Sequence, residues 1–347
     1  MNAAGFVEAK RPAYYVEDSS KNGWSRKATI FFTNGHLILQ GVAGTGKDIW
    51  IEAYSSAFNR PLKRFAFRAG LNPSDWVQRM DLKADENGTN TVPEDGDLLK
   101  ACRGIIVTRD FSGMPSEELQ EVIRELESID YIVENNDGVL KINIPSVCLF
   151  SDYDRADSEQ LEVLRQALEM GKGKLTNPIT GELFDIHPGT RFFFTSNSGV
   201  DGDGGRGNIT KRKDSSLLSR TRAIYTPEPT EKFETEVIMT KFPELLEAEA
   251  KLLVKCTRSV REVAKQQRMG LEITLRQTIA WAEDTILIRD IDGMEWKEAM
   301  KYSFSTITGH LGEEYNRDAL QGAIDPHLKS NVIDELSQSS TTCPIDL

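Results

Sequence analysis

The sequence predicts an α/β fold, with a parallel sheet between helices, followed by a smaller all-helical domain. Three observations predict it. A glycine-rich segment, residues 41–46, lies between an apolar run and a run with helical spacing. Strand-like and helix-like patterns then alternate as far as about residue 226, which is typical of parallel sheets. From about Thr230 onward the apolar residues recur at helical spacing.

The first predicted elements lead into and out of the glycine-rich segment. Residues 1–27 are mixed and polar, which favours an irregular arm or a short leading helix. Residues 36–40 are a short apolar run that ends at a glycine and predicts a buried strand. Helical spacing follows over residues 48–58, and residues 60–67 predict a second strand. Ser74 is the expected N-cap of the next helix.

The middle of the chain interrupts this alternation. Residues 83–97 are polar and predict a loop or a hairpin. An insertion of about residues 104–145 follows. It begins with a strand-like pattern, continues with an amphipathic helix over residues 115–129, and ends with a hairpin around an Asn-Asp-Gly turn.

The alternation then resumes and completes the predicted sheet. Residues 146–150 predict a buried strand, and residues 156–171 predict a helix that ends at a glycine. A second hairpin is expected over residues 174–186, and residues 191–197 predict another buried strand. The glycine-rich segment 198–208 is expected to be a mobile loop.

These patterns predict four parts of the chain. An N-terminal arm of residues 1–27 precedes the α/β domain of residues 28–226, which contains the insertion. A helical domain of residues 227–335 follows, and residues 336–347 are expected to be a disordered tail.

Composition limits the possible classes of protein. The 347 residues are 39% hydrophobic and 28% charged, which is typical of a globular chain. No apolar run approaches the roughly 20 residues that span a bilayer, and the N-terminus lacks the apolar core of a signal peptide. We therefore expect a cytoplasmic protein with no membrane contact. The net charge of −12 disfavours nucleic acid and favours a protein partner.

The strongest chemical signal is the segment from Gly41 to Asp48, which fits G-x-x-x-x-G-K between a strand and a helix. Glycines allow backbone N–H groups to face phosphates, and the following helix adds its dipole. Lys47 would reach the terminal phosphates. The predicted ATP-binding residues of this segment are Gly41, Gly44, Thr45, Gly46, Lys47 and Asp48. The alternative is a glycine-rich turn without a ligand.

Position 48 departs from this motif, because it holds Asp where Ser or Thr normally binds Mg²⁺. A carboxylate is itself a good ligand for a hard cation. However, it adds negative charge beside a polyphosphate. Asp48 is therefore a predicted metal ligand that leaves the efficiency of ATP hydrolysis open.

A second signal lies at the end of strand 146–150, where Ser151 precedes Asp152. P-loop ATPases place a magnesium-orienting Asp at such a strand end, and a catalytic acid is expected beside it, so this pair is one acid short. Asp152 could orient the water of the metal ion or polarise the attacking water, and Asp154 could share this role. The alternative is a strand end capped by solvated acids.

Three further polar positions follow. Asn197, at the tip of strand 191–197, could hold the attacking water, although such an Asn is often a turn residue. Arg220 could act as an arginine finger on the γ-phosphate of a neighbouring subunit, with Arg222 as second candidate and a surface salt bridge as the alternative.

Arg276, at the start of a helix that contains core residue Trp281, could contact nucleotide. The basic triplet at 211–213 is more typical of a solvated loop.

Taken together, the order of these motifs resembles the MoxR/CobS branch of the AAA+ ATPases, above all the CobS-type cobaltochelatase subunit. The resemblance covers about residues 28–310, interrupted by the insertion, and rests on these segments: GVAGTGKD, PSVCLFSDYDRAD, HPGTRFFFTSNSG, LLSRTR and TLRQTIAWAE.

This resemblance implies a P-loop AAA+ core with a helical lid, ATP and Mg²⁺ as ligands, and a hexameric ring of identical subunits. It also implies a partner with a von Willebrand A domain. Lys47 then binds phosphate, Asp152 belongs to Walker B, and Asn197 is the first sensor. Arg220 is the finger and Arg276 the second sensor.

Two functions are consistent with these residues. The first is an ATPase that uses ATP binding and hydrolysis to remodel a protein partner. The second is a nucleotide-gated scaffold with weak or no hydrolysis, which Asp48 and Ser151 favour. A nucleic-acid motor is disfavoured by the acidic composition.

Overall fold

The structure, a computed structural model, divides into two compact units. The first comprises residues 1–13, 17–42 and 46–227, and the second comprises residues 14–16, 43–45 and 228–347. The described residues are 12–17, 23–32, 35–67, 72–85, 88–169, 173–177, 180–197, 215–267, 269, 273–309 and 314–329. The predicted mobile loop at residues 198–208, the basic triplet at 211–213, the predicted tail and most of the N-terminal arm lie outside these ranges.

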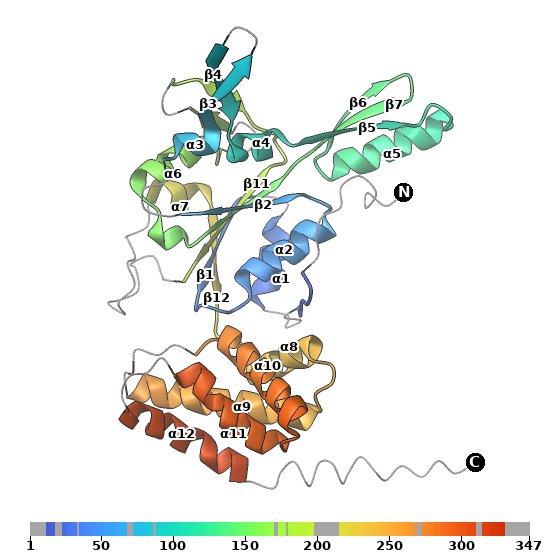
Figure 1. Ribbon diagram of the computed structural model, residues 1–347. Coiled ribbons are helices and arrows are strands. Elements are labelled where there is room, and N and C mark those ends of the chain that lie inside the picture. Colours follow the sequence, from blue (N-terminus) through green and yellow to red (C-terminus); the bar gives the residue numbers. More distant parts are fainter. Residues whose placement is uncertain are drawn as a thin grey trace, which may run out of the picture. The chain divides into compact units, whose positions relative to one another are not determined.

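A sheet of five parallel strands forms the centre of the first unit, in the order β12-β1-β11-β8-β2 (Figure 1). Its strands are β1 (Leu37–Gly41), β2 (Leu62–Ala66), β8 (Val147–Ser151), β11 (Arg191–Ser196) and β12 (Arg222–Thr226). All neighbouring pairs are parallel, so the carboxyl ends of the strands meet at one edge. The predicted fold class, a parallel sheet between helices with a helical region after it, is confirmed.

Helices cover both faces of this sheet, which explains why its central strands are apolar on both sides. Figure 1 shows α1 (Trp24–Phe32) and α2 (Lys47–Ala57) on one side, with α6 (Ser158–Arg165) and α7 (Ser215–Arg220) on the other. Along β11, Phe193 stacks on Phe32 of α1, with 5.0 Å between ring centroids. Its neighbour Phe194 stacks on Phe150 of β8 at 5.3 Å. Successive side chains of one strand thus belong to two different cores.

The insertion forms a body of its own beside this sheet. It contains β5 (Ile105–Asp110), α5 (Ser116–Ser128), β6 (Ile132–Asn136) and β7 (Val139–Ile144). The strands are antiparallel in the order β5-β7-β6, and α5 packs its apolar side onto them around Leu119, Leu126 and Ile142. Each element of the insertion that the sequence predicts is present.

Buried arginines hold the insertion to the core. The guanidinium of Arg60 lies 2.8 Å from the Asp130 carboxylate, and that of Arg191 lies 3.0 Å from it, while both arginine side chains are at most 5% exposed. Arg60 also donates to the backbone carbonyls of Ile129 and Gly189 at 3.0 Å. These bonds give two buried cations hydrogen-bond acceptors from both bodies.

The segment after β2 corrects one prediction. Ser74 is the first residue of α3 (Ser74–Val77), and Pro73 occupies the N-cap. The helix lasts one turn and leads into a hairpin of β3 (Gln78–Asp85) and β4 (Gly88–Asp95), which extends the predicted hairpin toward its N-terminus. The single turn of helix α3 packs against helix α4 (Asp97–Arg103). A second short hairpin, β9 (Lys174–Thr176) with β10 (Leu183–Asp185), lies where it is expected.

The second unit is helical in the residues that the structure describes. Its helices are α8 (Glu231–Lys241), α9 (Glu247–Gln266), α10 (Leu275–Asp292), α11 (Trp296–Thr308) and α12 (Glu314–Lys329). Trp281 of α10 is fully buried, as expected, and its indole N–H donates to the carbonyl of Met300 at 3.1 Å. A buried Trp needs such a partner for its polar end.

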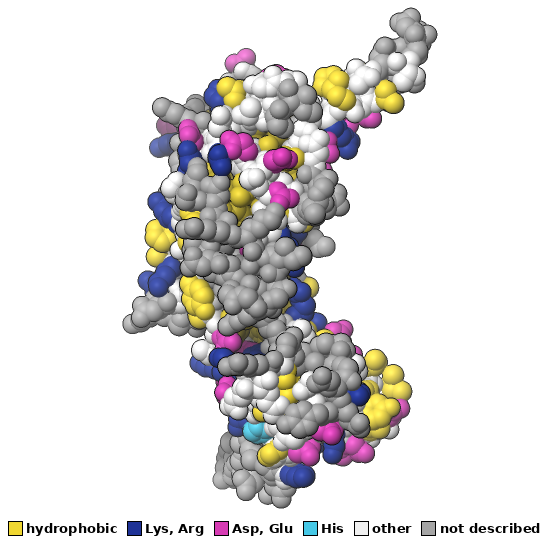
Figure 2. Space-filling view, turned by 90° about the vertical axis from the view of Figure 1, so that its left-hand side faces the viewer, with side chains coloured by type: hydrophobic (Ala, Val, Ile, Leu, Met, Phe, Trp, Pro, Cys, Tyr) yellow, Lys and Arg dark blue, Asp and Glu magenta, His cyan; other side chains and the backbone are white. Residues whose placement is uncertain are grey.

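Two properties of the surface bear on function. On the face in Figure 2, described acidic and basic side chains are interspersed rather than gathered by sign. Among the helices that the structure describes, none is both long and apolar enough to cross a membrane.

Candidate functional site

The predicted site residues of the first unit lie at the carboxyl edge of its sheet. The glycine-rich loop follows β1, Ser151 is the last residue of β8, and Asn197 directly follows β11. These three strands are neighbours in the order β1-β11-β8. In open parallel sheets, ligands bind beyond the carboxyl ends of the strands.

The loop after β1 has backbone angles that favour glycine at three points, Gly41, Gly44 and Gly46. Gly41 has φ +152°, and a Cβ atom there would lie 2.0 Å from the carbonyl oxygen of Thr226 on β12. Gly46, the N-cap of α2, has φ +83°, in the left-handed region where other residues are strained. The loop therefore turns sharply into α2, and the first N–H groups of this helix point toward the loop.

Lys47 lies folded over this loop. Its side chain is 5% exposed, and its ammonium group donates to the carbonyl of Gly41 at 2.9 Å and to that of Val42 at 2.8 Å. The cation is thus fixed above the backbone that precedes the helix. A phosphate at the N-terminus of α2 would meet both this charge and the helix dipole.

The two departures from the motif contact each other. The Ser151 hydroxyl donates to Oδ2 of Asp48 at 3.1 Å, although the two residues are 103 positions apart. The Asp48 side chain is 39% exposed. Sequence reasoning treats these positions separately, and only the packing of α2 against β8 brings them together.

Arg64 of β2 is a further member of this group that sequence reasoning misses. Its guanidinium lies 3.7 Å from the Asp48 carboxylate and 3.1 Å from that of Glu52, one turn further along α2. The positive charge offsets part of the negative charge that Asp48 brings to the loop. No signal in the sequence around residue 64 predicts this, because it depends on β2 lying beside β8.

Asp152 occupies an uncommon backbone conformation. With φ 55° and ψ 45° it is in the left-handed region, at the N-cap of the short helix η2 (Tyr153–Arg155). The Asn197 amide donates to Oδ1 of Asp152 at 3.4 Å, which is long for a hydrogen bond. The structure therefore brings together two predicted catalytic residues from neighbouring strands. Asp154, the possible helper, is only 5% exposed.

The two arginine-finger candidates differ in their surroundings. Arg220 ends α7, and its guanidinium lies 3.7 Å from the carboxylate of Glu169, with both side chains at least one-third exposed. Arg222 begins β12, and its guanidinium lies over the ring of Phe31, 4.8 Å from the centroid. Arg220 is thus held loosely by a surface acid, whereas Arg222 is held within the unit by an aromatic ring.

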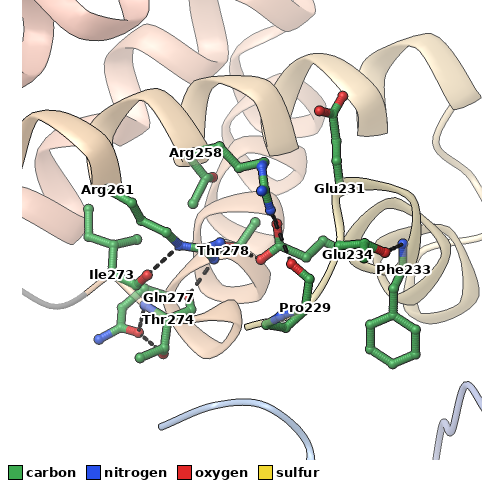
Figure 3. Close-up of polar contacts among 12 residues, drawn as sticks. Pro229, Glu231, Phe233, Glu234, Arg258, Arg261, Ile273, Thr274, Gln277 and Thr278 are labelled. Atoms are coloured by element: carbon green, nitrogen blue, oxygen red, sulfur yellow. Dashed lines mark hydrogen bonds and ion pairs between the residues drawn. The ribbon is translucent and has the colours of Figure 1, made fainter. Parts of the chain in front are cut away.

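In the second unit, a buried ion cluster fixes the start of α10 (Figure 3). The Glu234 carboxylate is 1% exposed and accepts bonds from Arg258 at 3.0 Å and from Arg261. Arg261 also donates to the carbonyl of Ile273 and to the Thr278 hydroxyl, on either side of the first turn of α10.

Arg276 belongs to that first turn. Thr274 caps the helix together with Gln277, whose side chain accepts from the Thr274 N–H at 2.9 Å. The charge of Arg276 acts on the Tyr14 phenol, whose pKa is raised by burial and lowered in part by this arginine. The ion cluster and the cap therefore hold the backbone that bears Arg276.

Residues 36–220 match the family model of the AAA domain, dynein-related subfamily. The chain belongs to this family. Its members are P-loop ATPases that bind ATP with magnesium, and the matched segment spans β1 to α7. The loop after β1, the end of β8 and the tip of β11 all lie inside the AAA domain.

More distant likenesses add context. An uncharacterized protein of Staphylococcus haemolyticus is 22% identical over 310 residues, which is 89% of this chain and 96% of that protein. Among solved structures, a mutant of RuvB from Thermotoga maritima is 13% identical with a TM-score of 0.45, over 92% of this chain and 79% of that one. The Thermotoga maritima RuvB Holliday junction branch migration motor is 14% identical, with a TM-score of 0.44 and coverage of 92% and 78%.

The residues present fit a nucleotide with Mg²⁺. This ion is usually held by one or two carboxylates together with substrate phosphates. Asp48 and Ser151 offer a carboxylate and a hydroxyl in contact, beside the helix N-terminus that would receive the phosphates.

Proposed function

We propose that the chain is an ATP-driven ring subunit that remodels a protein partner. Its membership in the AAA domain family supports ATP binding. The observation that favours hydrolysis most is the contact between Asp152 and Asn197 at the ends of adjacent strands. An acid and an amide side by side at this edge can orient and deprotonate a water molecule.

Each proposed role follows from the chemistry of the side chain. Lys47 and the loop N–H groups bind the phosphates, while Asp48 serves the metal side, where Mg²⁺ neutralises phosphate charge. Asp152 accepts a proton from the attacking water, and Asn197 positions that water. Arg276 contacts nucleotide from the helical region.

We further propose the MoxR/CobS-like branch of the family, a homohexameric ring and a partner with a von Willebrand A domain. The motif order in the sequence supports this branch. The net charge of −12 supports a protein partner over nucleic acid. Purification in the presence of ATP, followed by mass determination of the assembly and of co-purifying proteins, tests both points.

Nucleotide binding is tested with Lys47→Ala. This change removes charge-assisted contacts to phosphate that are worth roughly 1.5–3 kcal/mol each, so ATP affinity should fall at least tenfold. Titration calorimetry measures this affinity. Lys63→Ala, an exposed lysine on β2, is the matched control and should leave it unchanged. Equal affinity in Lys47→Ala would refute the phosphate-binding role.

A nucleotide-gated scaffold is the second candidate, and the altered residues Asp48 and Ser151 favour it. The two functions differ in turnover. A steady-state phosphate-release assay with magnesium should give clear turnover for the remodelling ATPase. ATP-dependent assembly without phosphate release would support the scaffold.

Arg220 is proposed to act on the γ-phosphate of a neighbouring subunit. Arg220→Ala should leave ATP binding nearly intact and reduce hydrolysis on the order of 10³-fold or more. Mixing Arg220→Ala with Lys47→Ala subunits should restore activity at interfaces that join an intact loop to an intact finger.

The ion pair with Glu169 supplies the control for this test. If Arg220 matters only through that pair, Glu169→Gln should copy the loss of activity. If mixed rings form and no activity returns, Arg220 is not the finger, and Arg222 is examined next.

A further inference from the structure

Asp48 and Ser151 both depart from the usual magnesium-binding residues of P-loop ATPases. In P-loop ATPases, Mg²⁺ is held by the Ser or Thr hydroxyl after the loop lysine and by an Asp at the end of the Walker B strand. Here the position after Lys47 is an Asp, and the residue at the end of β8 is a Ser. The two side chains are in direct contact, with the hydroxyl donating to the carboxylate at 3.1 Å.

We propose that the hydroxyl and the carboxylate of the magnesium site have changed places in this chain. Asp48 supplies the carboxylate from α2, and Ser151 supplies the hydroxyl from β8. This inference rests on the proposed ATP binding and names the residues that serve its metal. The donor types and the net charge of the pair are the same as in the usual arrangement, and only the elements that carry them differ.

The surroundings of Asp48 suit a carboxylate on the helix side. Asp48 lies in the first turn of α2, where a negative charge is stabilised by the helix dipole. The same turn is where phosphates would bind, so an added charge would repel them. Arg64 offsets this charge, since its guanidinium lies 3.7 Å from Asp48 and 3.1 Å from Glu52.

The accessibility of the pair suits a site that receives an ion. The Asp48 side chain is 39% exposed, so the carboxylate keeps oxygen lone pairs that face solvent while it accepts from Ser151. The proposed exchange therefore keeps one carboxylate and one hydroxyl available to Mg²⁺.

The exchange is tested by reversing it. Four proteins are compared: the natural chain, Asp48→Thr, Ser151→Asp, and the double variant with both changes. The affinity for a fluorescent ADP is measured in EDTA and in magnesium, and bound Mn²⁺ is measured by electron paramagnetic resonance in the presence of ADP. Thermal unfolding without nucleotide checks that each variant is folded.

The expected result is coupling between the two positions. Asp48→Thr leaves two hydroxyls, so the gain in affinity on adding magnesium should fall at least tenfold. Ser151→Asp leaves two carboxylates, so affinity in EDTA should fall through added repulsion. The double variant should recover both the magnesium effect and the affinity in EDTA to within about threefold of the natural chain, because it again holds one carboxylate and one hydroxyl.

Two isosteric changes and one control guard against misfolding of these variants. Asp48→Asn and Ser151→Ala should each weaken the magnesium effect and the Mn²⁺ signal. Glu159→Gln, which removes an exposed acid from the first turn of α6, should leave both readouts unchanged.

The outcomes separate this inference from the proposed function. If the natural chain binds no nucleotide in either buffer, ATP binding itself is refuted. If it binds nucleotide but Asp48→Asn leaves the magnesium effect intact, Asp48 is not a ligand. If the double variant keeps both the weakened magnesium effect and the weakened affinity in EDTA, the positions have not exchanged roles, and their contact only joins α2 to β8.

Discussion

Glu234 and Asp48 are two of the carboxylates that contact arginine in this protein, and they differ in almost every other respect. Glu234, in the helical unit, is 1% exposed and accepts bonds from two arginines. Asp48, in the α/β unit, is 39% exposed, lies 3.7 Å from its one arginine partner in the described residues, and accepts a hydroxyl bond at 3.1 Å. Glu234 is closed off by its partners, and Asp48 is open to solvent.

The difference teaches which charged groups hold the fold and which are available for ligands. A buried carboxylate must be fully bonded, because its desolvation is costly. A half-exposed carboxylate with long contacts can exchange its partners at little cost, since solvent replaces them. Stability and ligand binding should therefore respond oppositely to changes at the two sites.

The largest effect on stability is expected for Glu234→Ala. Removal of this buried carboxylate leaves the partly buried Arg261, which is 19% exposed, without its counter-charge. Breaking a fully buried ion pair typically costs about 3–5 kcal/mol, which is the upper bound here. Differential scanning calorimetry should show a clear drop in the melting temperature. Glu236→Ala, an exposed acid on the same helix, is the control and should change stability by at most about 0.5 kcal/mol. If Glu236→Ala lowered the melting temperature as much as Glu234→Ala, the buried ion pairs of Glu234 would not be the cause of the loss.

Acid pH should have the next largest effect, and through the core of the α/β unit. Burial lowers the pKa of His36 to about 3 and that of His187 to about 4. Each imidazole accepts a backbone N–H at Nδ1, from Phe192 and Gly189 respectively, which requires the neutral ring. The unfolded chain binds these protons below about pH 6.5, and the folded chain does not, so stability falls as the pH falls.

The loss should be about 2 kcal/mol for each histidine between pH 7 and pH 5. Urea unfolding at pH 7, 6 and 5 measures it. His36→Asn keeps a hydrogen-bond acceptor near the position of Nδ1. This variant should lose less stability between pH 7 and pH 5 than the natural chain, by the amount that His36 contributes. An unchanged slope in this variant would mean that the pKa of His36 is the same in the folded and the unfolded chain.

The smallest effect on stability is expected for Asp48→Asn. The change affects a half-exposed group with weak pairing, so the free energy of unfolding should shift by no more than about 0.5 kcal/mol. Calorimetry without nucleotide measures this. A destabilisation close to that of Glu234→Ala would show that Asp48 holds the fold, contrary to the comparison.

The sequence predicts the elements whose pattern is local. The apolar strands β1, β8 and β11, the edge strand β2, and the helix and hairpin of the insertion are predicted by apolar runs, helical spacing and turn residues. Strand β12 is missed, because it is an edge strand with three exposed residues out of five and no apolar run. The length of helix α3 is overestimated. The residues at its start favour a helix, but the chain leaves the helix after one turn to form the β3–β4 hairpin.

For the candidate site, order along the chain predicts more than residue identity does. Asp152 and Asn197 are expected together because each follows a buried strand, and they do lie in contact. The contact of Asp48 with Ser151 and the position of Arg64 are not predictable in this way. They depend on the rotation of α2 about its axis and on which strand lies beside β8, and both are set by packing of the whole sheet.

The left-handed backbone of Asp152 decides which variant should be used to capture a binding partner of this protein. Residues with a short polar side chain, Asp and Asn, visit this conformation more readily than Ala or Gln. Asp152→Asn should therefore silence the carboxylate and leave the turn into η2 in place. Asp152→Ala would add backbone strain of roughly 1–2 kcal/mol and confuse a chemical effect with a conformational one. Asp152→Asn is therefore the better variant for capturing a partner, because under the proposed function it should bind ATP without hydrolysing it and so remain bound to the partner.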